Sequence, residues 1–214
     1  MFTGIIEELG RLVNIEQDGG NTHFTIEANM ASELKIDQSV AHDGCCLTVV
    51  QKNDHQYKVT AIQETLNRTI LGGWKVDTMV NLERCMKNDG RFDGHIVQGH
   101  VDCNAICENV QENDGSWEFF FKYESDHITV EKGSITINGT SLTVVNSEEN
   151  AFSVCIIPYT FDNTTFKNIK KGSRVNLEFD ILGKYIKKYM GASWGNIIFG
   201  NMRAKKVENV GPCV

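Results

Sequence analysis

The sequence predicts an all-β protein made of two similar domains, and three observations support this prediction. The segment GCCLTVV at 44–50 returns as GTSLTVV at 139–145, a shift of 95 residues (139 − 44). The same shift relates ETLNRTIL at 64–71 to YTFDNTTF at 159–166, and VNLE at 80–83 to VNLE at 175–178. Short runs of alternating apolar residues, broken by turn residues, fill both copies. A long period that occurs twice indicates two domains rather than a solenoid.

The strands follow from the alternation of apolar and polar residues. In the first copy we expect them at Leu9–Ile15, Thr22–Ile26, Cys45–Gln51, Tyr57–Ile62 and Met79–Arg84. In the second copy we expect them at Asp102–Val110, Trp117–Tyr123, Ser134–Ile137, Leu142–Asn146, Phe152–Ile157 and Arg174–Phe179. Asp43-Gly44 and Asn138-Gly139 predict type I′ hairpin turns, because both positions of such a turn need positive φ. Short strands with frequent turns indicate an antiparallel sandwich or barrel.

Helical signals are weak inside the repeats, where 29–35 and 64–70 can each form a turn or two. The stretch 181–190 is different, because its apolar residues recur at helical spacing, with Gly191 as the expected end. They are Ile181, Leu182, Tyr185, Ile186, Tyr189 and Met190. An apolar helix beyond two complete repeats suggests a contact between subunits. We therefore divide the chain into domains at 1–96 and 97–180 and a helix with its tail at 181–214, whose last dozen residues are expected to be loose.

Composition narrows the class of protein. The 214 residues carry a net charge of −7, which disfavours nucleic acid as a partner. No apolar run reaches the length of a membrane span. The seven cysteines include the adjacent Cys45 and Cys46, and no secretory leader follows Met1, so a reducing cytoplasmic location is expected. Cys103 and Cys107 lack a second pair of ligands nearby, so no metal site is expected.

The repeated element [DN]-G-x-[CS]-L-T-V suggests chemistry. It leads from a turn into a strand and places a thiol or hydroxyl two residues before a threonine, on one face of that strand. The pairs are Cys46 with Thr48 and Ser141 with Thr143. Because threonine is common in strands, a purely structural role is the alternative for each pair.

The positions where the two copies differ suggest two related pockets with unequal chemical roles. Their pairs are His100 opposite Ile5, Lys132 opposite Asp37, Asp180 opposite Cys85 and Ser141 opposite Cys46. His100 is a candidate acid or base, with a core or surface histidine as the alternative. His95 lies five residues earlier, which on a strand places the two rings on opposite faces. We therefore do not expect them to share a metal or a proton.

Four segments resemble one known family, the riboflavin synthases of the α-chain type. They are MFTGIIE at 1–7, SVAHDGCCLTV at 39–49, GHIVQGHVD at 94–102 and KGSITINGTSLTV at 132–144. The resemblance covers residues 1–184 and both repeats in order. Beyond Tyr185 only the helical character is similar, and the end of the chain, rich in Gly, Trp and Phe, has no match.

The resemblance implies two tandem homologous six-stranded antiparallel Greek-key β-barrels, a C-terminal α-helix and a homotrimer built around those helices. It implies a transferase reaction in the last step of riboflavin biosynthesis, without a metal or redox cofactor. Two molecules of 6,7-dimethyl-8-ribityllumazine bind, one passes four carbons to the other, and the products are riboflavin and 5-amino-6-ribitylaminouracil. The resemblance also implies that each active site lies between the N-terminal barrel of one subunit and the C-terminal barrel of its neighbour. Association with lumazine synthase is a further possible partnership.

The site residues follow from the same resemblance. The reacting groups fall on Ser39, Cys46, His100, Ser141, Thr143 and Asp180. The first pocket is expected to use Gly4, Ile5, Ile6, Cys46, Leu47, Thr48, Thr60, Ala61, Ile62, Gln63, Glu64 and Thr65. The second is expected to use Gly99, His100, Val101, Lys132, Ser141, Leu142, Thr143, Cys155, Ile156, Ile157, Pro158, Tyr159 and Thr160. Which group is the base and which the nucleophile stays open.

Two rival functions remain. One is a lumazine or flavin carrier that looks like the same two barrels without catalysis; such carriers lack the histidines of the GHIVQGH segment and the C-terminal helix. The other is a barrel that binds nucleic acid or belongs to a reductase, which the acidic charge and the missing dinucleotide motif disfavour.

Overall fold

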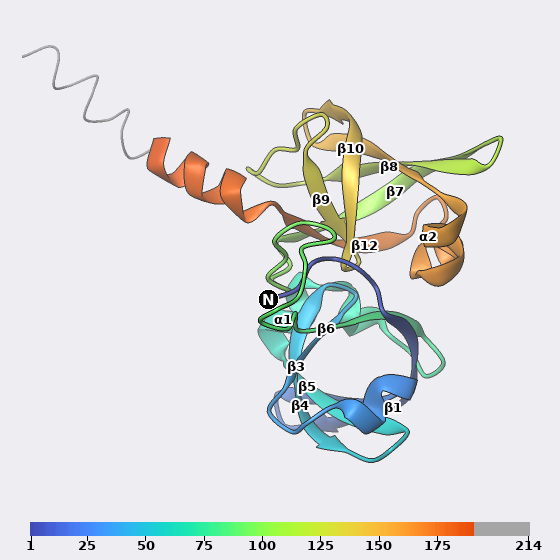
Figure 1. Ribbon diagram of the computed structural model, residues 1–214, viewed down its shortest axis with the longest axis vertical. Helices are drawn as coiled ribbons and strands as arrows, with labels where there is room; N and C mark the ends of the chain where they lie inside the picture. The colour runs from blue at the N-terminus through green and yellow to red at the C-terminus, as the bar shows by residue number, and fades with distance from the viewer. Residues whose placement is uncertain (191–214) are drawn as a thin grey trace, which may run out of the picture. The chain divides into compact units, whose positions relative to one another are not determined.

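The computed structural model describes residues 1–190, and twelve strands in residues 8–179 form two closed antiparallel barrels (Figure 1). The first contains β1 (Glu8–Asp18), β2 (Asn21–Glu27), β3 (Ser39–His42), β4 (Cys45–Lys52), β5 (Gln56–Ile62) and β6 (Met79–Arg84). The second contains β7 (Cys103–Asn113), β8 (Ser116–Tyr123), β9 (Ser134–Ile137), β10 (Thr140–Glu148), β11 (Ala151–Ile156) and β12 (Arg174–Phe179). The two tandem six-stranded barrels expected from the sequence are confirmed.

The strand order is the same in both barrels. In the first it is β1-β2-β5-β4-β3-β6, and the second follows it with each number raised by six, read around the closed sheet. Irregularities in the pairing also repeat, between Leu12 and Asn14 in β1 and between Cys107 and Asn109 in β7. These bulges bend long strands so that the sheet can close. The repeat seen in the sequence is therefore a repeat of backbone geometry.

Short helices connect some of the strands, and those that follow β5 and β11 lie at matched positions. The first barrel has η1 (Asn29–Glu33), α1 (Gln63–Arg68) and η2 (Ile70–Gly73), and the second has α2 (Pro158–Asn163) and η3 (Thr165–Asn168). The turns expected at 29–35 and 64–70 are confirmed. Residues 181–190 form a helix as expected, whereas the expected stop at Gly191 and the loose tail lie outside the described residues. Residues 1–180 form one compact unit, and the helix belongs to a second.

One strand of the first barrel was missed by the pattern. β3 has four residues, and Val40, Ala41 and His42 are all buried, so no alternation marks it. The hairpin turns that follow β3 and β9 are as expected, with φ of 44° and 80° at Asp43 and Gly44 and of 45° and 81° at Asn138 and Gly139. Positive φ at both residues is the geometry of a type I′ turn.

Each barrel has its own apolar core. Leu12, Phe24 and Val59 lie in the first, and Phe119, Phe121 and Ile135 lie in the second, all with 1% exposure or less. In the first barrel β5 places Tyr57, Val59 and Ala61 inward, so that the residues between them face outward. Inward residues thus fix which neighbours are left to form a surface site.

Buried amides join the two barrels at their matching turns. Asn81 donates from Nδ2 to Asn138 O at 2.8 Å, and Asn176 donates from Nδ2 to Asp43 O at 2.8 Å. Asp43 and Asn138 in turn accept the backbone N–H groups of Asn81 and Asn176, at 2.9 and 2.8 Å. Because buried amides are costly to leave unpaired, this network fixes the contact between the turns.

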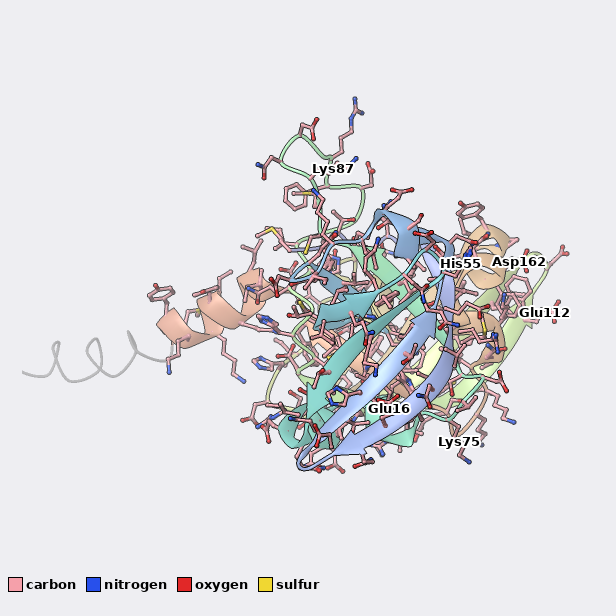
Figure 2. All side chains as sticks on the ribbon, turned by 90° about the horizontal axis from the view of Figure 1, so that it is seen from below. Glu16, His55, Lys75, Lys87, Glu112 and Asp162 are labelled. Atoms are coloured by element: carbon pink, nitrogen blue, oxygen red, sulfur yellow. The ribbon has the colours of Figure 1, made fainter. Side chains whose placement is uncertain are left out.

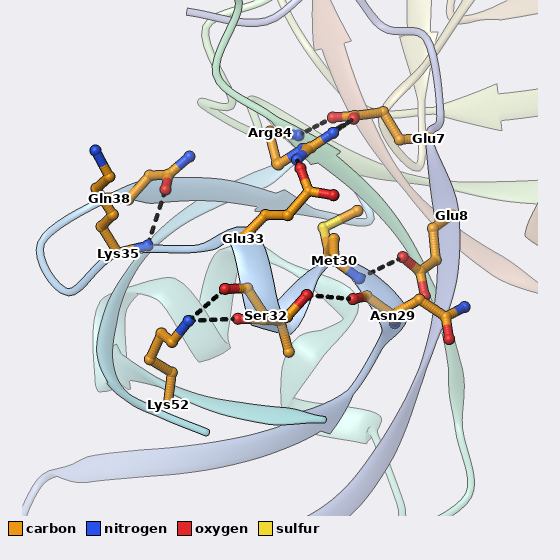
Figure 3. A network of polar contacts seen from close by, with 11 residues as sticks. Glu7, Glu8, Asn29, Met30, Ser32, Glu33, Lys35, Gln38, Lys52 and Arg84 are labelled. Carbon is orange, nitrogen blue, oxygen red and sulfur yellow. Dashed lines mark hydrogen bonds and ion pairs between the residues drawn. The ribbon is translucent and has the colours of Figure 1, made fainter. Parts of the chain in front are cut away.

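Polar contacts connect β6 and the start of β1 to η1, as Figure 3 shows. The guanidinium of Arg84 contacts Glu7 and Glu33, each at 2.6 Å. The carboxylate of Glu8 accepts the N–H groups of Asn29 and Met30. Arg84 is 30% exposed, so these ion pairs contribute modestly to stability and mainly set local geometry.

Candidate functional site

The two copies of [DN]-G-x-[CS]-L-T-V form the β3–β4 and β9–β10 hairpins. In β4, Leu47 and Val49 point into the core, Cys46 is half-buried and Thr48 is exposed. In β10, Ser141 is half-buried and Thr143 is exposed. The alternation of the strands places each reactive side chain and its threonine on the outer face, as the sequence predicts.

The first group of candidate residues surrounds Cys46. The side chains of Ser39 and Cys46 are hydrogen-bonded, and Phe2, Ala41 and Val97 form the apolar cluster beneath them. Burial raises the pKa of the Cys46 thiol, and the hydrogen bond to Ser39 opposes this effect. The thiol is therefore protonated near neutral pH. It acts there as a weak hydrogen-bond donor or as a packing contact rather than as a preformed thiolate.

The second group surrounds Ser141 and contains a histidine that the sequence analysis did not select. His95 Nδ1 and Ser141 Oγ lie 2.7 Å apart, and His95 Nε2 lies 3.1 Å from Thr136 Oγ1. Burial lowers the pKa of His95, and the charge of Asp180 opposes this shift. A neutral imidazole between two hydroxyls can accept a proton from one of them and pass it on.

Two loops that contain a glycine, at residues 3–5 and 98–100, contact the two groups. We call them the glycine loops, and each contacts the group that lies in the other copy of the repeat. Ser141 donates its backbone N–H to Gly4 O at 2.7 Å, and Cys46 donates its N–H to Gly99 O at 2.9 Å. A Cβ atom at Gly4 would lie 2.6 Å from Ser141 Cβ, and one at Gly99 would lie 2.6 Å from Cys46 Cβ. Both glycines have φ near +80° (81° and 79°), so glycine is required there for its conformation as well as its size.

These contacts correct the expected grouping of the pockets. From the family resemblance, carried over motif by motif, we grouped Gly4, Ile5 and Ile6 with Cys46, and Gly99 to Val101 with Ser141. Instead Gly4 lies on Ser141, Gly99 lies on Cys46, and Val101 packs on the core of the first barrel. The segment that bears His100, which is exposed, thus belongs with Cys46, and the imidazole at Ser141 is His95. The reason is that the loop of each copy packs on the barrel of the other copy, which the order of residues in the sequence does not reveal.

The two histidines lie at opposite ends of one segment. Gly94 packs on Thr3 and Ser141, because a Cβ there would fall 2.1 Å from Thr3 O and 2.8 Å from Ser141 Cβ. Gly99 packs on Cys46 at the other end. The segment is not a strand, apart from a single bridge between Phe2 and Val97. The rings are separated by this crossing rather than by the two faces of a strand, which was the reason we expected.

The remaining predicted residues lie on the strands and helices next to these groups. Thr60 Oγ1 lies 2.8 Å from His23 Nδ1, and Cys155 takes the matching position in β11. Lys132 is exposed, and its charge acts on the Cys155 thiol, whose pKa burial raises. Large apolar side chains are exposed at Ile62 and Ile157, by 57% and 59%.

The remaining positions divide between exposed and partly buried side chains. Gln63, Glu64, Pro158 and Tyr159 are exposed, and Ile6, Thr65, Leu142 and Thr160 are partly buried.

Three predicted residues are core residues. The side chains of Leu47, Ala61 and Ile156 lie inside the barrels, with exposures of 6%, 1% and 0%. We expected backbone and side chains of these segments at the pockets, and for these three only the backbone is available. The correction follows from strand alternation, since each lies between two outward residues.

A cleft of about 800 Å³ opens beside Ile5 and Cys85. Its walls include Arg84, which contacts Glu7 and Glu33 as Figure 3 shows. Lys87, labelled in Figure 2, lies on the loop that forms its rim. The cleft reaches Thr3 and therefore borders the loop that lies on Ser141.

Within residues 1–190, no helix is long and apolar enough to cross a membrane. In the same part of the chain no three residues among His, Cys, Asp and Glu gather in an arrangement that could hold a metal ion.

Comparison with known proteins identifies the repeat. The model of the lumazine binding domain family matches residues 3–85 and again 98–180. A riboflavin synthase of Actinobacillus pleuropneumoniae is 41% identical over 89% of this chain and 90% of its own length. Riboflavin synthases of Bacillus subtilis (strain 168) and Saccharomyces cerevisiae are each 36% identical, over 89% and 88% of this chain and 90% and 85% of their own lengths.

Solved structures agree on the fold. The crystal structure of LumP complexed with 6,7-dimethyl-8-(1'-D-ribityl) lumazine matches with a TM-score of 0.76 at 22% identity, over 84% of this chain and 99% of that one. LumP complexed with riboflavin matches with a TM-score of 0.76 at 23% identity, over 83% and 98%. With two matched domains and relatives of this identity over nearly their full length, the chain belongs to the riboflavin synthase family of proteins with two lumazine binding domains.

Proposed function

We propose that this protein is a transferase that converts two molecules of 6,7-dimethyl-8-ribityllumazine into riboflavin and 5-amino-6-ribitylaminouracil. The donor loses a four-carbon unit, the acceptor gains it, and the atoms of the two substrates balance those of the two products. Membership of the family supports this function, as do the names of the relatives. The LumP structures add that barrels of this fold hold a lumazine or riboflavin.

The proposal depends mainly on one observation. The two candidate sites have the same backbone arrangement but different reactive side chains. One site has the thiol of Cys46 beside Ser39, and the other has the hydroxyl of Ser141 bonded to the imidazole of His95. Two identical substrates with different fates need two similar but unequal pockets. Two equal binding sites in a carrier would not need this difference.

The proposed mechanism begins with a proton transfer. The protons of the 7-methyl group of a lumazine are acidic, because the carbanion delocalises into the electron-poor ring. His95 is partly buried, burial lowers its pKa, and its Nδ1 lies within hydrogen-bond distance of Ser141 Oγ, so this pair is suited to accept such a proton directly or through the hydroxyl. The larger contribution of the protein is to hold two rings in register, which converts a bimolecular step into a unimolecular one.

We further propose that the site is completed by a neighbouring subunit in a homotrimer. The helix 181–190 carries exposed apolar side chains, with 58% of Leu182, 58% of Tyr185, 59% of Ile186 and 71% of Tyr189 accessible. Ile62 and Ile157 are exposed at the two candidate sites as well. Apolar surface of this kind is typical of subunit contacts. A cytoplasmic location and association with lumazine synthase remain part of the same proposal.

The direct test is to mix the protein with 6,7-dimethyl-8-ribityllumazine alone and record the absorbance and fluorescence of riboflavin. We expect one riboflavin for every two lumazines consumed, with 5-amino-6-ribitylaminouracil as the second product. Tight binding of the lumazine without turnover would instead favour the carrier function.

A further inference from the structure

The repeated VNLE segments place one glutamate of each barrel at a buried position. Glu83 ends the copy in β6 and Glu178 ends the copy in β12. Their exposures are 4% and 2%. A carboxylate that is removed from water this completely needs hydrogen-bond donors. The nearest donors show what the two residues do.

Each carboxylate collects N–H groups from one glycine loop. Glu83 accepts Thr3 N at 2.6 Å, Thr3 Oγ1 at 3.0 Å and Gly4 N at 2.9 Å. Glu178 accepts Gln98 N at 2.7 Å, and Gly99 N and His100 N each at 2.9 Å. Hydrogen bonds to a charged acceptor are the stronger kind, and two or three on one group fix the path of a loop.

Each loop that is held in this way then contacts the other barrel. Glu178 belongs to the second barrel, but the loop it holds lies on Cys46 of the first, through the bond from Cys46 N to Gly99 O. Glu83 belongs to the first barrel, but its loop lies on Ser141 of the second, through the bond from Ser141 N to Gly4 O. The shift of 95 residues relates Glu83 to Glu178, Gly4 to Gly99 and Cys46 to Ser141.

We propose that Glu83 and Glu178 are crossed positioning residues for the two candidate sites. Glu178 sets Gly99 and His100 against Cys46, and Glu83 sets Gly4 and Ile5 against Ser141. Neither needs to touch a substrate to act. That these sites take part in catalysis rests on the proposed function. The position of each loop, however, is a property of this chain that can be measured without substrate.

The first test measures how well Gly99 covers Cys46. Iodoacetamide is added to the full-length protein and to its Glu178→Ala and Glu178→Gln variants, and alkylation of each cysteine is followed by mass spectrometry. We expect Cys46 to react about tenfold faster or more in Glu178→Ala, because three hydrogen bonds to a charged group are lost together. Glu178→Gln should have a smaller effect, since its amide oxygen still accepts one or two of the N–H groups.

Other cysteines supply the controls within the same sample. Cys45 and Cys107 are 5% and 0% exposed and should stay protected in every variant, and Cys155 is exposed and should react in all of them. The matched control variant is Glu112→Gln, which removes one charge from the exposed β7–β8 hairpin (Figure 2). An unchanged Cys46 rate in Glu178→Ala would overturn the proposal. A joint rise of Cys46, Cys45 and Cys107 would overturn it too, because it would show general unfolding.

The second test addresses Glu83 at the other site. Thr3 O accepts His95 N at 3.1 Å, so release of the Thr3–Gly4 loop should loosen His95. We expect the NMR titration of His95, assigned with His95→Gln, to move upward towards the ordinary value in Glu83→Ala, because burial holds its pKa down. Glu178→Ala should leave this titration in place. An equal shift in both variants would contradict the crossed assignment.

Turnover separates this inference from the proposed function. In both alanine variants we expect kcat to fall by ~10², the usual effect of a misplaced catalytic geometry, with a smaller change in KM. If the unmodified protein makes no riboflavin, the proposed function fails, and the alkylation and NMR patterns still decide the positioning. If turnover survives in both variants while the unmodified protein is active, the proposed function stands, and the inference that these glutamates position groups used in catalysis fails.

Discussion

His95 and Ser141 form a hydroxyl–imidazole pair at one site, and Cys46 and Ser39 form a thiol–hydroxyl pair at the other. The first pair is 2.7 Å apart and can move a proton, since burial keeps the imidazole neutral. The second contains a thiol whose pKa burial raises, so it is suited to contact a ring rather than to attack it. Single residues thus give two equal backbones different chemistry.

Replacing His95 should separate catalysis from binding. In His95→Gln the amide can still contact Ser141, but it cannot accept a proton, so we expect turnover to fall by ~10²–10⁴ while riboflavin binding changes less than tenfold. Because burial lowers the pKa of His95, the acid limb of kcat/KM in the unmodified protein should lie below the ordinary histidine value. The comparison is His100→Ile, which carries the residue of the first copy. A larger loss in His100→Ile than in His95→Gln would assign the base to His100 instead.

Asp43 should control the pH dependence of stability. Burial raises the pKa of Asp43 from 3.8 to about 7, so its favourable contribution is complete below pH 3.8 and is lost as pH rises to 7. Burial also lowers the pKa of His42 from 6.5 to about 4, and its contribution is lost as pH falls through that range. The two effects oppose each other between pH 4 and 6.5.

Asp43→Asn isolates the effect of Asp43. The second copy has Asn138 at this position, with the same backbone and the same bond to a buried N–H, so the change fits locally. We expect the variant to be on the order of 4 kcal/mol more stable than the unmodified protein at pH 8, and to show no such gain near pH 4. Urea unfolding at both values measures this. An equal difference at pH 4 and pH 8 would contradict the assignment to Asp43.

At the scale of elements, matched strands and matched bulges build two closed barrels, and the helix 181–190 adds a surface rather than a core. Its apolar residues recur at helical spacing, and five of them are more than half exposed. The glycine loops at 3–5 and 98–100 are the other decisive elements, because each is held by one barrel and lies on the other. These elements, rather than the barrels alone, define where a site can form.

Removal of the helix should change assembly. A chain that ends at Asp180 keeps both barrels, and we expect it to form monomers or dimers with most of its activity lost, since the proposed site needs two subunits. Sedimentation velocity gives the assembly state and the riboflavin assay gives the activity. A truncated protein that remains an active trimer would refute this role of the helix.

At the scale of the whole molecule, the two barrels depend on each other. Asn81 and Asn176 donate to the turns of the opposite barrel, and the two glycine loops cross between the candidate sites. Either half of the chain by itself therefore lacks contacts that the other half supplies, which the sequence repeat does not suggest. Val97, Gly99 and Val101 contact the first barrel, although they lie beyond the expected boundary at residue 96. The division of the chain into domains at residue 96 stays a prediction.

Two fragments of the first half should differ in ligand binding. Residues 1–96 contain Cys46 and Thr48 but lack Gly99, which packs on Cys46, whereas residues 1–101 include Val97, Gly99 and Val101. Full burial of a valine side chain such as Val97 is worth about 1.5–3 kcal/mol, and Val101 adds a partly buried contact. We therefore expect the longer fragment to be more stable and to bind riboflavin about tenfold more tightly. Fluorescence titration of both fragments measures the difference. Equal affinities would show that the first pocket does not use this segment.

The sequence by itself determined the duplication, the all-β class, most strands, the two type I′ turns and the helix at 181–190, because these depend on local period and turn chemistry. It also selected Cys46, Ser141 and their threonines, since strand alternation fixes their face. The tertiary structure alone decided that Gly4 lies on Ser141, that Gly99 lies on Cys46 and that His95 is the imidazole beside Ser141. A crossing between barrels joins residues that are 46 to 137 positions apart (141 − 95 and 141 − 4), and no local pattern records such a contact. The repeated glutamates of VNLE were visible from the start, but their role depends on N–H groups that only the folded chain brings to them.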